Sequence, residues 1–481
     1  MTAPLWTAED AAAATGGQAT AAWAATGVSI DTRSLGPGDL FVALTGEARD
    51  GHDFVADALA CGAAAALVSR VPEGLASDAP LLVVEDTLDA LVALGRAGRA
   101  RAAAKVIAVT GSAGKTTTKE MLRLMLAPQG EVHAAEASFN NHWGVPLTLA
   151  RLAPDAAFAA VEIGMNHAGE ITPLTQLTRP DVAIVTTVAE AHVGNFPDGI
   201  EGVARAKGEI FAGLGPGGTA VLPADSPWLA ILEGAAGPAA RVYVGAADRA
   251  DPQLLDARLH AGATVVRATL HGAPWSFRIG APGQHLAANA LAALAAVEAA
   301  GADPTRAALA LSAWRAGAGR GARWVVAIGH GGLDGEITLI DESYNANPAS
   351  VRAALAVLAA QQTEDGLGRV SRGRRIAFLG DMFELGEAEE ALHAGLAEAP
   401  EMAGIDLVHC CGPRMQALWE ALPQAKRGHW CPESTAMAEK ARRVLDAGDV
   451  CMVKGSKAAA MGRVIEAVKG LGTARLADEA G

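Results

Sequence analysis

The chain has 481 residues, of which 51% are hydrophobic and 19% charged, which is typical of a globular rather than a disordered protein. This length exceeds one ordinary hydrophobic core, so we expect two to four domains. A formal net charge of −14 argues against a nucleic-acid-binding surface and against a polybasic membrane patch.

The N-terminal residues and the cysteines both favour a cytoplasmic location. Residues 1–17 contain neither a basic segment nor a long apolar run, so we expect no signal peptide. No stretch reaches about 18 consecutive apolar residues, so we expect no membrane insertion. The cysteines show no regular spacing, which fits reduced thiols better than a disulfide framework or a zinc site. They are Cys61, Cys410, Cys411, Cys431 and Cys451.

A first zone, which we place at residues 1–103, alternates short strand-like runs with helices. Near its start, Thr7 and Asp10 have the spacing of a helix N-cap. Helices are expected at 54–60 and 87–101. The expected strands are VSIDTRS (28–34), DLFVAL (39–44), AALVSR (65–70) and LLVVED (81–86).

A second zone, at residues 104–316, alternates apolar strands with helices, which predicts parallel strands joined by crossover helices. The expected strands are KVIAVT (105–110), FAAVEIGM (158–165), DVAIVTTV (181–188) and TAVLP (219–223); the helices are GVPLTLARL (144–152) and IEGVARAKGEIF (200–211). Residues 241–279 change to short runs, RVYVG, LLDARL, ATVVRATL and PWSFRI, which predict an antiparallel flap. A helix at 286–300 closes the zone.

A third zone, at residues 317–481, repeats the strand–helix alternation and predicts a second open α/β sheet. Its expected strands are EITLID (336–341), RIAFLGDM (375–382), DLVHCCG (406–412) and VCMVKGS (450–456). The predicted fold class is therefore α/β with three domains. These are a small N-terminal α/β domain, a central P-loop ATPase-like domain with a mostly parallel sheet and an antiparallel flap, and a C-terminal Rossmann-like domain.

The segment VTGSAGKTTTKE (109–120) is the strongest chemical signal in the chain. An apolar strand ends at Thr110, a tight loop follows, and Lys115 and Thr116 open a helix. Backbone N–H groups at such a helix start can bind phosphates, Lys115 can reach the β/γ oxygens, and the Thr116 hydroxyl can bind Mg²⁺. Because Val109 stands where the usual GxxxxGK[ST] spacing needs glycine, a glycine-rich turn capped by lysine is the alternative. The expected ATP-binding residues are Gly111, Ser112, Ala113, Gly114, Lys115, Thr116 and Thr117.

A shortened GxxGKT loop is typical of the Mur ligase family, and further segments resemble this family in the same order along nearly the whole chain. These segments are DTRSLGPGDLFVALTGEARDGHDF (31–54), SFNNHWGVPLTL (138–149), VEIGMNHAGEI (161–171), TTVAEAHVGNF (186–196), ARAKGEIF (204–211), GQHLAANALAA (283–293), GRGAR (319–323), DESYNANP (341–348), LGDMFELGE (379–387) and VKGSKAAAM (453–461). The resemblance implies a UDP-precursor-binding first domain, an ATP-binding central domain, and a C-terminal domain for nucleotide and acceptor. Ala113 departs from the family, where asparagine is frequent; this removes one side-chain contact and leaves the backbone cradle.

The resemblance implies that Glu162, His192 and Lys207 are catalytic together with Lys115, and that the first three bind Mg²⁺ alongside Thr116. Lys207 would carry a carbamate formed with CO₂, which requires a neutral amine and hence a lowered lysine pKa. Without the resemblance, a simpler interpretation stays open for each. Glu162 could be a solvated strand-end acid, His192 a structural histidine, and Lys207 an exposed lysine paired with an acid.

Further nucleotide contacts also follow from the resemblance. They are Asn289, Arg320, Asp341, Tyr344 and Asn345. An amide such as Asn289 can pair with an adenine edge, and Arg320 can hold the γ-phosphate. Asn289 could equally be a polar residue on a half-buried helix, and Arg320 one of several interchangeable basic residues. Asn347 and Pro348 have the pattern of an N-cap and first helical position, so part of DESYNANP could be structural.

The same resemblance assigns substrate contacts at both ends of the chain. Arg33 and Ser34 are expected at the UDP pyrophosphate, and Lys454 and Ser456 on the acceptor side, although a strand-end turn also explains the latter pair. DESYNANP, LGDMFELG and VKGS most resemble the family members that add D-alanyl-D-alanine to a UDP-linked muramoyl tripeptide in peptidoglycan biosynthesis. We expect ATP and Mg²⁺ as cofactors and a monomer as the working form.

Three other functions are compatible with parts of this pattern. A sister ligase would add a single amino acid to the same precursor, or glutamate to folate. A P-loop switch or motor would use ATP to change partners, but the second α/β domain with its own strand-end motifs argues against it. The third is a nucleotide-binding α/β protein of no particular chemistry.

Overall fold

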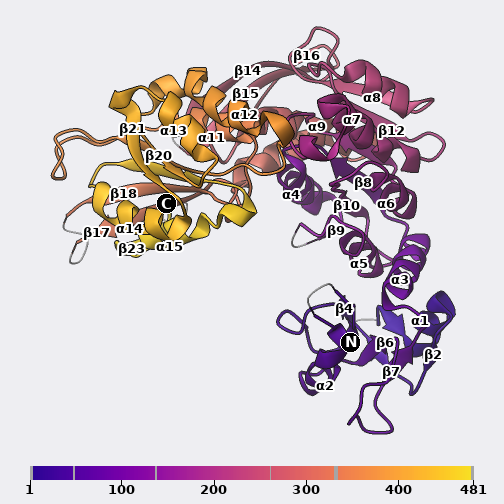
Figure 1. The fold of residues 1–481 in the computed structure, drawn as a ribbon. Coiled ribbons are helices and arrows are strands. Elements are labelled where there is room, and N and C mark those ends of the chain that lie inside the picture. The colour runs from indigo at the N-terminus through magenta and orange to yellow at the C-terminus, as the bar shows by residue number, and fades with distance from the viewer. Residues whose placement is uncertain (1–3, 47–48, 136–137, 261, 330–333, 478–481) are drawn as a thin grey trace.

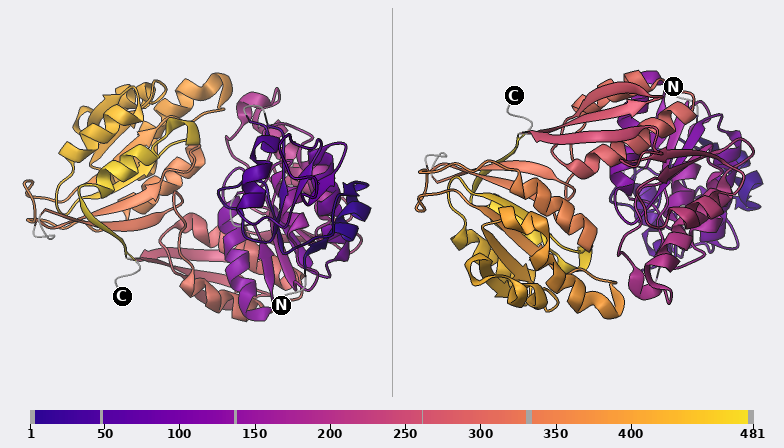
Figure 2. Two further views of the ribbon diagram at one scale, coloured as in Figure 1. Left: turned by 90° about the horizontal axis from the view of Figure 1, so that it is seen from below. Right: turned by 90° about the horizontal axis from the view of Figure 1, so that it is seen from above.

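The computed structural model describes residues 4–46, 49–135, 138–260, 262–329 and 334–477, and it has three α/β domains. Residues 47–48 of the predicted segment 31–54 lie outside this described part. In Figure 1 the first domain (indigo) lies at one end of the central domain, away from the C-terminal domain (orange to yellow). Figure 2 shows from two sides that the central and C-terminal domains lie next to each other. The predicted fold class is confirmed.

The first domain is built on a five-stranded sheet with the order β2-β7-β6-β5-β4. Strands β4 to β7 are parallel, and β2 pairs antiparallel with β7. The strands are β1 (Trp6–Thr7), β2 (Gln18–Ala19), β3 (Ala24–Ala25), β4 (Gly27–Ser29), β5 (Asp39–Val42), β6 (Ala65–Val68) and β7 (Leu81–Val83); the helices are α1 (Ala8–Thr15), α2 (Val55–Ala60) and α3 (Thr87–Arg101). Thr7 caps α1 by accepting from the Asp10 N–H, as predicted.

The central domain holds a parallel six-stranded sheet with the order β13-β12-β11-β8-β10-β9. Its strands are β8 (Lys105–Thr110), β9 (Val132–Ala134), β10 (Phe158–Glu162), β11 (Val182–Val185), β12 (Thr219–Pro223) and β13 (Ala240–Val244). Placing RVYVG in the antiparallel flap was wrong, because β13 pairs parallel with β12 at the sheet edge. The intervening apolar helix α8 (Leu229–Ala236), which the sequence analysis did not identify, supplies the crossover that a parallel pair requires.

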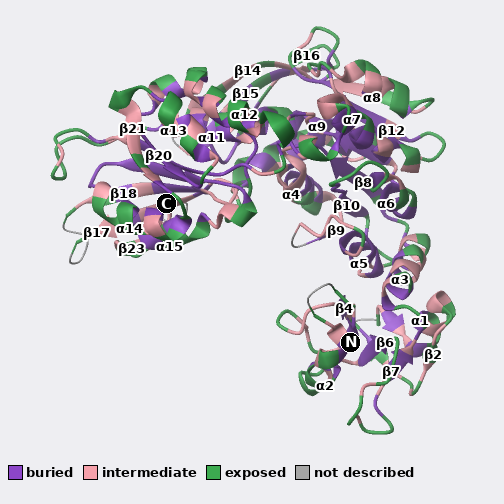
Figure 3. Ribbon diagram, in the orientation of Figure 1, coloured by how far each residue is buried: buried purple, intermediate pink, exposed green. Residues whose placement is uncertain are grey.

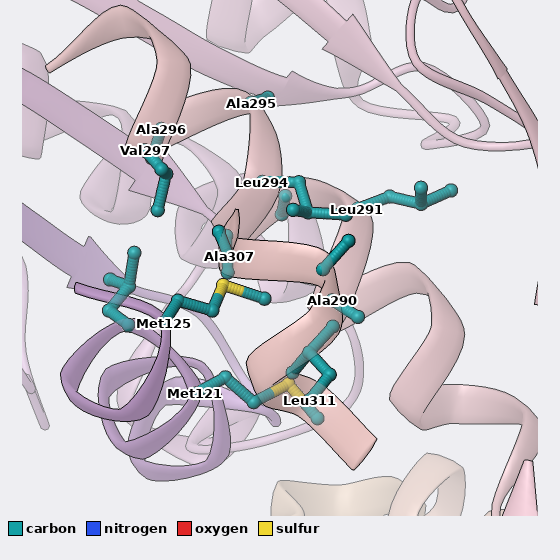
Figure 4. Close-up of a cluster of buried hydrophobic side chains, with 14 of the residues drawn as sticks. Met121, Met125, Ala290, Leu291, Leu294, Ala295, Ala296, Val297, Ala307 and Leu311 are labelled. Atoms are coloured by element: carbon teal, nitrogen blue, oxygen red, sulfur yellow. The ribbon is translucent and has the colours of Figure 1, made fainter. Parts of the chain in front are cut away.

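Hydrophobic clusters cover both faces of the central sheet. The helices are α4 (Lys115–Leu126), α5 (Gly144–Ala150), α6 (Ile171–Thr178), α7 (Gly199–Gly208), α9 (Gln284–Ala299) and α10 (Pro304–Ala310). Figure 4 shows Met121 and Met125 of α4 among Ala290, Ala307 and Leu311. The alanine-rich α9 is buried along most of its length, since small side chains let it pack closely against its neighbours. A three-stranded antiparallel flap, β14 (Gln253–His260), β15 (Ala263–Leu270) and β16 (Ala273–Ile279), completes the domain.

The C-terminal domain has a seven-stranded sheet with the order β21-β20-β19-β22-β18-β17-β23. The inner strands are parallel, and β17 pairs antiparallel with both neighbours. The strands are β17 (Ala322–Ile328), β18 (Glu336–Glu342), β19 (Arg375–Gly380), β20 (Leu407–Cys411), β21 (Arg427–Cys431), β22 (Val450–Lys454) and β23 (Gly472–Leu476); the helices are α11 (Pro348–Ala359), α12 (Glu389–Ala394), α13 (Met415–Ala421), α14 (Ser434–Val444) and α15 (Gly462–Lys469). Figure 3 shows the strands of this sheet and of the central sheet buried between helices. Within the described part of the chain, no helix combines the length and hydrophobicity needed to cross a membrane.

The first and central domains are joined by close backbone packing between α3 and α5. A Cβ atom on Gly95 would lie 2.8 Å from the Pro146 carbonyl oxygen, and one on Gly98 would lie 2.3 Å from the Leu149 oxygen. Trp6 of the first domain also donates from its indole N–H to the Ala150 carbonyl at 2.8 Å. These contacts leave no room for larger side chains on this face of α3.

We expect Gly98→Ala to lower the free energy of unfolding by about 1–3 kcal/mol, because the added methyl group overpacks this helix contact. The matched control is Gly234→Ala in α8, where nothing lies within 4 Å of the new Cβ. That change should stabilise by roughly 0.5–1 kcal/mol through helix propensity. Urea unfolding followed by circular dichroism compares the two variants, and equal midpoints would contradict the packing argument.

Candidate active site

The predicted P-loop connects β8 to α4 and is fastened to the loop that follows β11. The Ser112 N–H donates to the Thr187 carbonyl at 2.7 Å, and the Thr186 hydroxyl donates to the Ala113 carbonyl at 2.6 Å. Gly114 has a φ of 86°, in the left-handed region that favours glycine. The predicted ATP-binding residues therefore occupy one loop and one helix start: Gly111, Ser112, Ala113, Gly114, Lys115, Thr116 and Thr117.

Glu162 stands at the carboxyl end of β10, and it is not a solvated acid. It is only 2% exposed. Its Oε2 accepts from the Thr116 hydroxyl at 2.7 Å, and its Oε1 accepts from the Asn140 amide at 2.7 Å. The carboxylate is thus held beside the first turn of α4 by two directed hydrogen bonds.

Lys207 lies on α7 and is fully buried, which contradicts the alternative of an exposed lysine paired with an acid. Among the described residues, its Nζ has no hydrogen-bond partner. Burial lowers the pKa of this amine well below its usual value, and the Lys115 charge acts in the same direction. Glu209, Glu170 and Glu162 oppose this shift. A neutral amine is therefore favoured at this position.

The Lys115 side chain bends back over the loop, and its Nζ donates to the Gly111 carbonyl at 2.6 Å. Burial lowers the pKa of the Lys115 ammonium, while Glu162 opposes the shift and Arg320 reinforces it. Glu162 and Lys115 itself also act on the pKa of Lys207, so Lys115, Glu162 and Lys207 share one electrostatic environment. This environment lies at the carboxyl edge of the sheet, where open α/β folds bind ligands.

His192 lies in the loop after β11 and has a φ of 61°, which is uncommon for a residue with a side chain. Its Nδ1 contacts Oε2 of Glu384, which belongs to the C-terminal domain. Burial lowers the pKa of the His192 imidazole; Glu384 opposes this, while Lys207 and Lys115 add to it. The charges of Lys115 and Lys207 therefore act on His192, just as the charge of Lys115 acts on Lys207.

The predicted nucleotide contacts divide between the two domains. Asn289 is buried on α9 against the P-loop, since a Cβ on Gly114 would lie 2.6 Å from its Oδ1. Arg320 donates to the Ser138 hydroxyl at 2.9 Å, and its guanidinium lies 3.9 Å above the centre of the Tyr344 ring. The structure thus brings Arg320 and Tyr344 near the residues that surround the P-loop.

Asp341 and Asn345, by contrast, engage their own domain. Asp341 accepts from the Ser343 hydroxyl at 2.6 Å and from the Gly319 N–H at 3.0 Å. The Asn345 carbonyl accepts from Lys454 Nζ at 3.0 Å. These contacts stabilise the turn that follows β18.

Lys454 and Ser456 are buried at the end of β22. Lys454 also lies 3.3 Å from Glu342, and the Ser456 hydroxyl accepts from the Phe383 N–H at 3.1 Å. Their polar atoms thus hold the loops after β18 and β19, as the strand-end alternative supposes. Their acceptor role stays a prediction.

Arg33 and Ser34 lie in the first domain, on the loop after β4. Arg33 is exposed and forms an ion pair with Asp31 at 2.5 Å. This hydrogen-bonded arginine lowers the pKa of the Asp31 carboxyl to about 2. Their role at the UDP pyrophosphate stays a prediction.

Four contacts of the site were not predicted. Ser138 and Asn140 lie in the loop after β9, within a segment that resembled the family but from which no residue was singled out. Glu384 comes from the LGDMFELGE segment in the same way. Asn347 was predicted as an N-cap, and it does form a capping box on α11, but its amide also donates to the Ser112 carbonyl at 3.4 Å. The sequence resemblance therefore identified the segments, whereas the residue that each side chain contacts depends on the fold.

Comparisons with known proteins agree with this architecture. Family models match residues 24–99 (Mur ligase family, catalytic domain), 109–297 (Mur ligase middle domain) and 328–457 (Mur ligase, glutamate ligase domain). The UDP-N-acetylmuramoyl-tripeptide–D-alanyl-D-alanine ligase of Escherichia coli is 38% identical over 454 residues, 93% of this chain and 94% of that one. The Bacillus subtilis ligase of the same name is 37% identical over 76% of both chains.

Solved structures are similar over nearly the whole chain. MurF from Acinetobacter baumannii has a TM-score of 0.80 and 29% identity, covering 97% of this chain and 99% of that chain. MurF from Thermotoga maritima, solved with ADP, has a TM-score of 0.74 and covers 92% and 97% of the two chains. At 24% identity, this second similarity shows the fold alone.

We expect Gly114→Ala to weaken ADP binding at least tenfold, which corresponds to about 1.4 kcal/mol. The new side chain would have to adopt a φ of 86°, and its Cβ would lie 2.6 Å from Asn289 Oδ1. Titration calorimetry with ADP measures the change. Gly215→Ala is the control, because nothing lies within 4 Å of its Cβ. Unchanged affinity in Gly114→Ala would exclude this loop as the phosphate cradle.

Proposed function

The chain belongs to the Mur ligase family, and we infer that it joins D-alanyl-D-alanine to a UDP-N-acetylmuramoyl-tripeptide with cleavage of ATP, in peptidoglycan biosynthesis. The structural observation that carries this function is the P-loop at the start of α4, beside a buried carboxylate and a buried lysine that has no hydrogen-bond partner in the described part of the chain. Such a site can hold a triphosphate next to a second anion. An ATP-dependent carboxylate activation needs this arrangement.

The reaction has two steps. A carboxylate oxygen of the tripeptide attacks the γ-phosphorus of ATP, so that an acyl phosphate forms and ADP leaves. The amine of D-alanyl-D-alanine then attacks the acyl carbon, and phosphate leaves as the amide forms and the amine loses a proton. We propose that the N–H groups at the start of α4, Lys115 and Arg320 bind the phosphates, because catalysis here consists of positioning and charge neutralisation.

Mg²⁺ fits the residues at this site. The Thr116 hydroxyl and the buried Glu162 carboxylate offer the oxygen ligands that this ion prefers. Carbamylation of the buried Lys207 amine would add further anionic oxygens. We propose that Thr116 and Glu162 hold one Mg²⁺, and that Glu162, His192 and the Lys207 carbamate hold a second. The ions would neutralise charge between the triphosphate and the substrate carboxylate.

The remaining assignments follow the domains. We propose that residues 1–103 bind the UDP moiety near Arg33 and Ser34, and that 104–316 bind ATP, with Asn289 at the adenine. Residues 317–481 would complete the nucleotide site with Asp341, Tyr344 and Asn345. Lys454 and Ser456 would shape the acceptor side through the loops that they hold. A cytoplasmic location is proposed from the reduced-thiol pattern and from the nature of the substrates, and a monomer is proposed as the working form.

A substrate panel tests the proposed reaction. We expect ADP release only when ATP, the UDP-linked tripeptide and D-alanyl-D-alanine are all present, with formation of the UDP-linked pentapeptide detected by mass spectrometry. Lys115→Ala is the inactive control, since it keeps the loop but removes the phosphate-binding ammonium. Turnover with a single amino acid or with folate and glutamate, but not with the dipeptide, would instead identify a sister ligase. Turnover without any amine acceptor would favour a switch.

We expect Lys207→Ala to reduce the ligase turnover at least 100-fold, because the carbamate oxygens are lost from the proposed metal site. A small carboxylate such as acetate should restore part of the activity by occupying the vacated space. Lys440→Ala, at an exposed position of α14, is the matched control and should stay within about 0.5 kcal/mol in stability and near the original rate. Full activity of Lys207→Ala in CO₂-depleted buffer would refute the carbamate.

A further inference from the structure

Two loops meet at the level of the backbone across the boundary between the central and C-terminal domains. One contains η3 (Val193–Asn195), and the other ends at η7 (Gly386–Ala388). The Gly194 N–H donates to the Glu384 carbonyl at 3.2 Å. A Cβ on Gly194 would lie 2.9 Å from the Gly386 nitrogen, and one on Gly386 would lie 3.0 Å from the Gly194 Cα. Glycine on both sides therefore permits this close approach.

The side chains that flank this contact are also in contact. Oε2 of Glu384 contacts Nδ1 of His192. Among the described residues, the imidazole makes this one hydrogen bond. Both belong to the small set of described non-glycine residues with positive φ, 61° for His192 and 64° for Glu384. Such conformations persist where the surroundings enforce them, and they are concentrated at functional sites. Two strained residues from different domains thus face each other.

Glu384 is carried by a loop that is fixed within the C-terminal domain. The Phe383 N–H donates to the Ser456 hydroxyl at 3.1 Å, and the Met382 N–H donates to His393 Nε2 at 3.0 Å. The Arg414 guanidinium lies 4.6 Å above the centre of the Phe383 ring. The position of the Glu384 carboxylate therefore follows the C-terminal domain as a whole.

A carboxylate bound at Nδ1 determines what the other ring nitrogen can do. The proton is held on Nδ1, so that Nε2 keeps its lone pair and the ring keeps its orientation. Metal-binding histidines regularly have a partner of this kind, and its removal reduces metal affinity by about 10- to 100-fold. Here the partner comes from a different domain than the histidine.

We propose that Glu384 is a positioning residue, which presents His192 to the second Mg²⁺ only when the C-terminal domain is docked on the central domain. This inference rests on the metal assignment made under the proposed function. Because docking and metal binding then share one contact, each must favour the other by the same factor. The second metal site would therefore form when the C-terminal domain docks on the central domain.

The test measures Mn²⁺ binding to the full chain with ADP, by electron paramagnetic resonance of the free ion, in variants of both sides of the contact. Glu384→Ala should weaken binding of the His192-dependent ion about tenfold or more. It should also raise the Mg²⁺ concentration needed for half-maximal turnover, without a change in KM for the UDP-linked tripeptide. Glu384→Gln keeps an acceptor oxygen but not the charge, so its Mn²⁺ affinity should lie between those of the original protein and Glu384→Ala. His192→Ala combined with Glu384→Ala should bind no more weakly than His192→Ala alone.

Gly194→Ala gives an independent test, because its backbone has no positive φ and its new methyl group would separate the loops while all proposed ligands remain. We expect weaker Mn²⁺ binding and a larger radius of gyration in X-ray scattering; Gly215→Ala, with no atom within 4 Å, should change neither. If His192→Ala loses the ion while Glu384→Ala and Gly194→Ala keep the original affinity, the positioning role is wrong and the metal assignment survives. If His192→Ala also binds Mn²⁺ normally, the metal assignment itself fails and the inference fails with it.

Discussion

The rest of the structure depends on the burial of ionisable side chains at the carboxyl edge of one parallel sheet. The order β11-β8-β10 places the carboxyl ends of three neighbouring strands side by side. The P-loop, the loop that contains His192, and Glu162 therefore converge. Taking charges out of water is costly unless they are paired or neutralised. Glu162 is stabilised by two hydrogen bonds, whereas Lys207 has none among the described residues. The proposed carbamate and Mg²⁺ would compensate the burial of Lys207.

Much of the architecture could be predicted from periodicity and caps, because these are local. Helix 87–101 was predicted with its observed bounds, and the N-cap at Asn347 is present. The edge strand β13 was misplaced, since strand-like runs look alike whether they pair with a parallel or an antiparallel neighbour. What decided its place was the crossover helix α8, whose eight residues LAILEGAA were too short to stand out.

The burial of a site residue such as Lys207 can be predicted from its sequence spacing, but its contacts cannot. Val203, four residues before Lys207, and Ile210, three residues after it in the 3₁₀ helix that follows α7 (Glu209–Gly213), have the spacing of one apolar face. The sequence therefore contained a signal that Lys207 is buried. The partners of the site were not available in this way. Asn140 reaches Glu162, Arg320 reaches Ser138, and Glu384 reaches His192 across sequence separations that only the fold defines. The resemblance identified the segments, and the three-dimensional structure identified which atoms meet.

The two domain boundaries differ in their contacts, which are mainly apolar at the first and polar at the second. Helices α3 and α5 join the first and central domains through a shared apolar cluster and through the close approach of Gly95 and Gly98 to the α5 backbone. Between the central and C-terminal domains, the polar contacts that we described lie at the site itself: Asn347 with Ser112, Arg320 with Ser138, and Glu384 with His192 and Gly194. Separation of these domains would break contacts to the P-loop and to the proposed metal ligand His192 at once. If Glu384 positions His192 as proposed, docking of the C-terminal domain and assembly of the site are one event. This would confine a reactive acyl phosphate to the state in which its acceptor is also present.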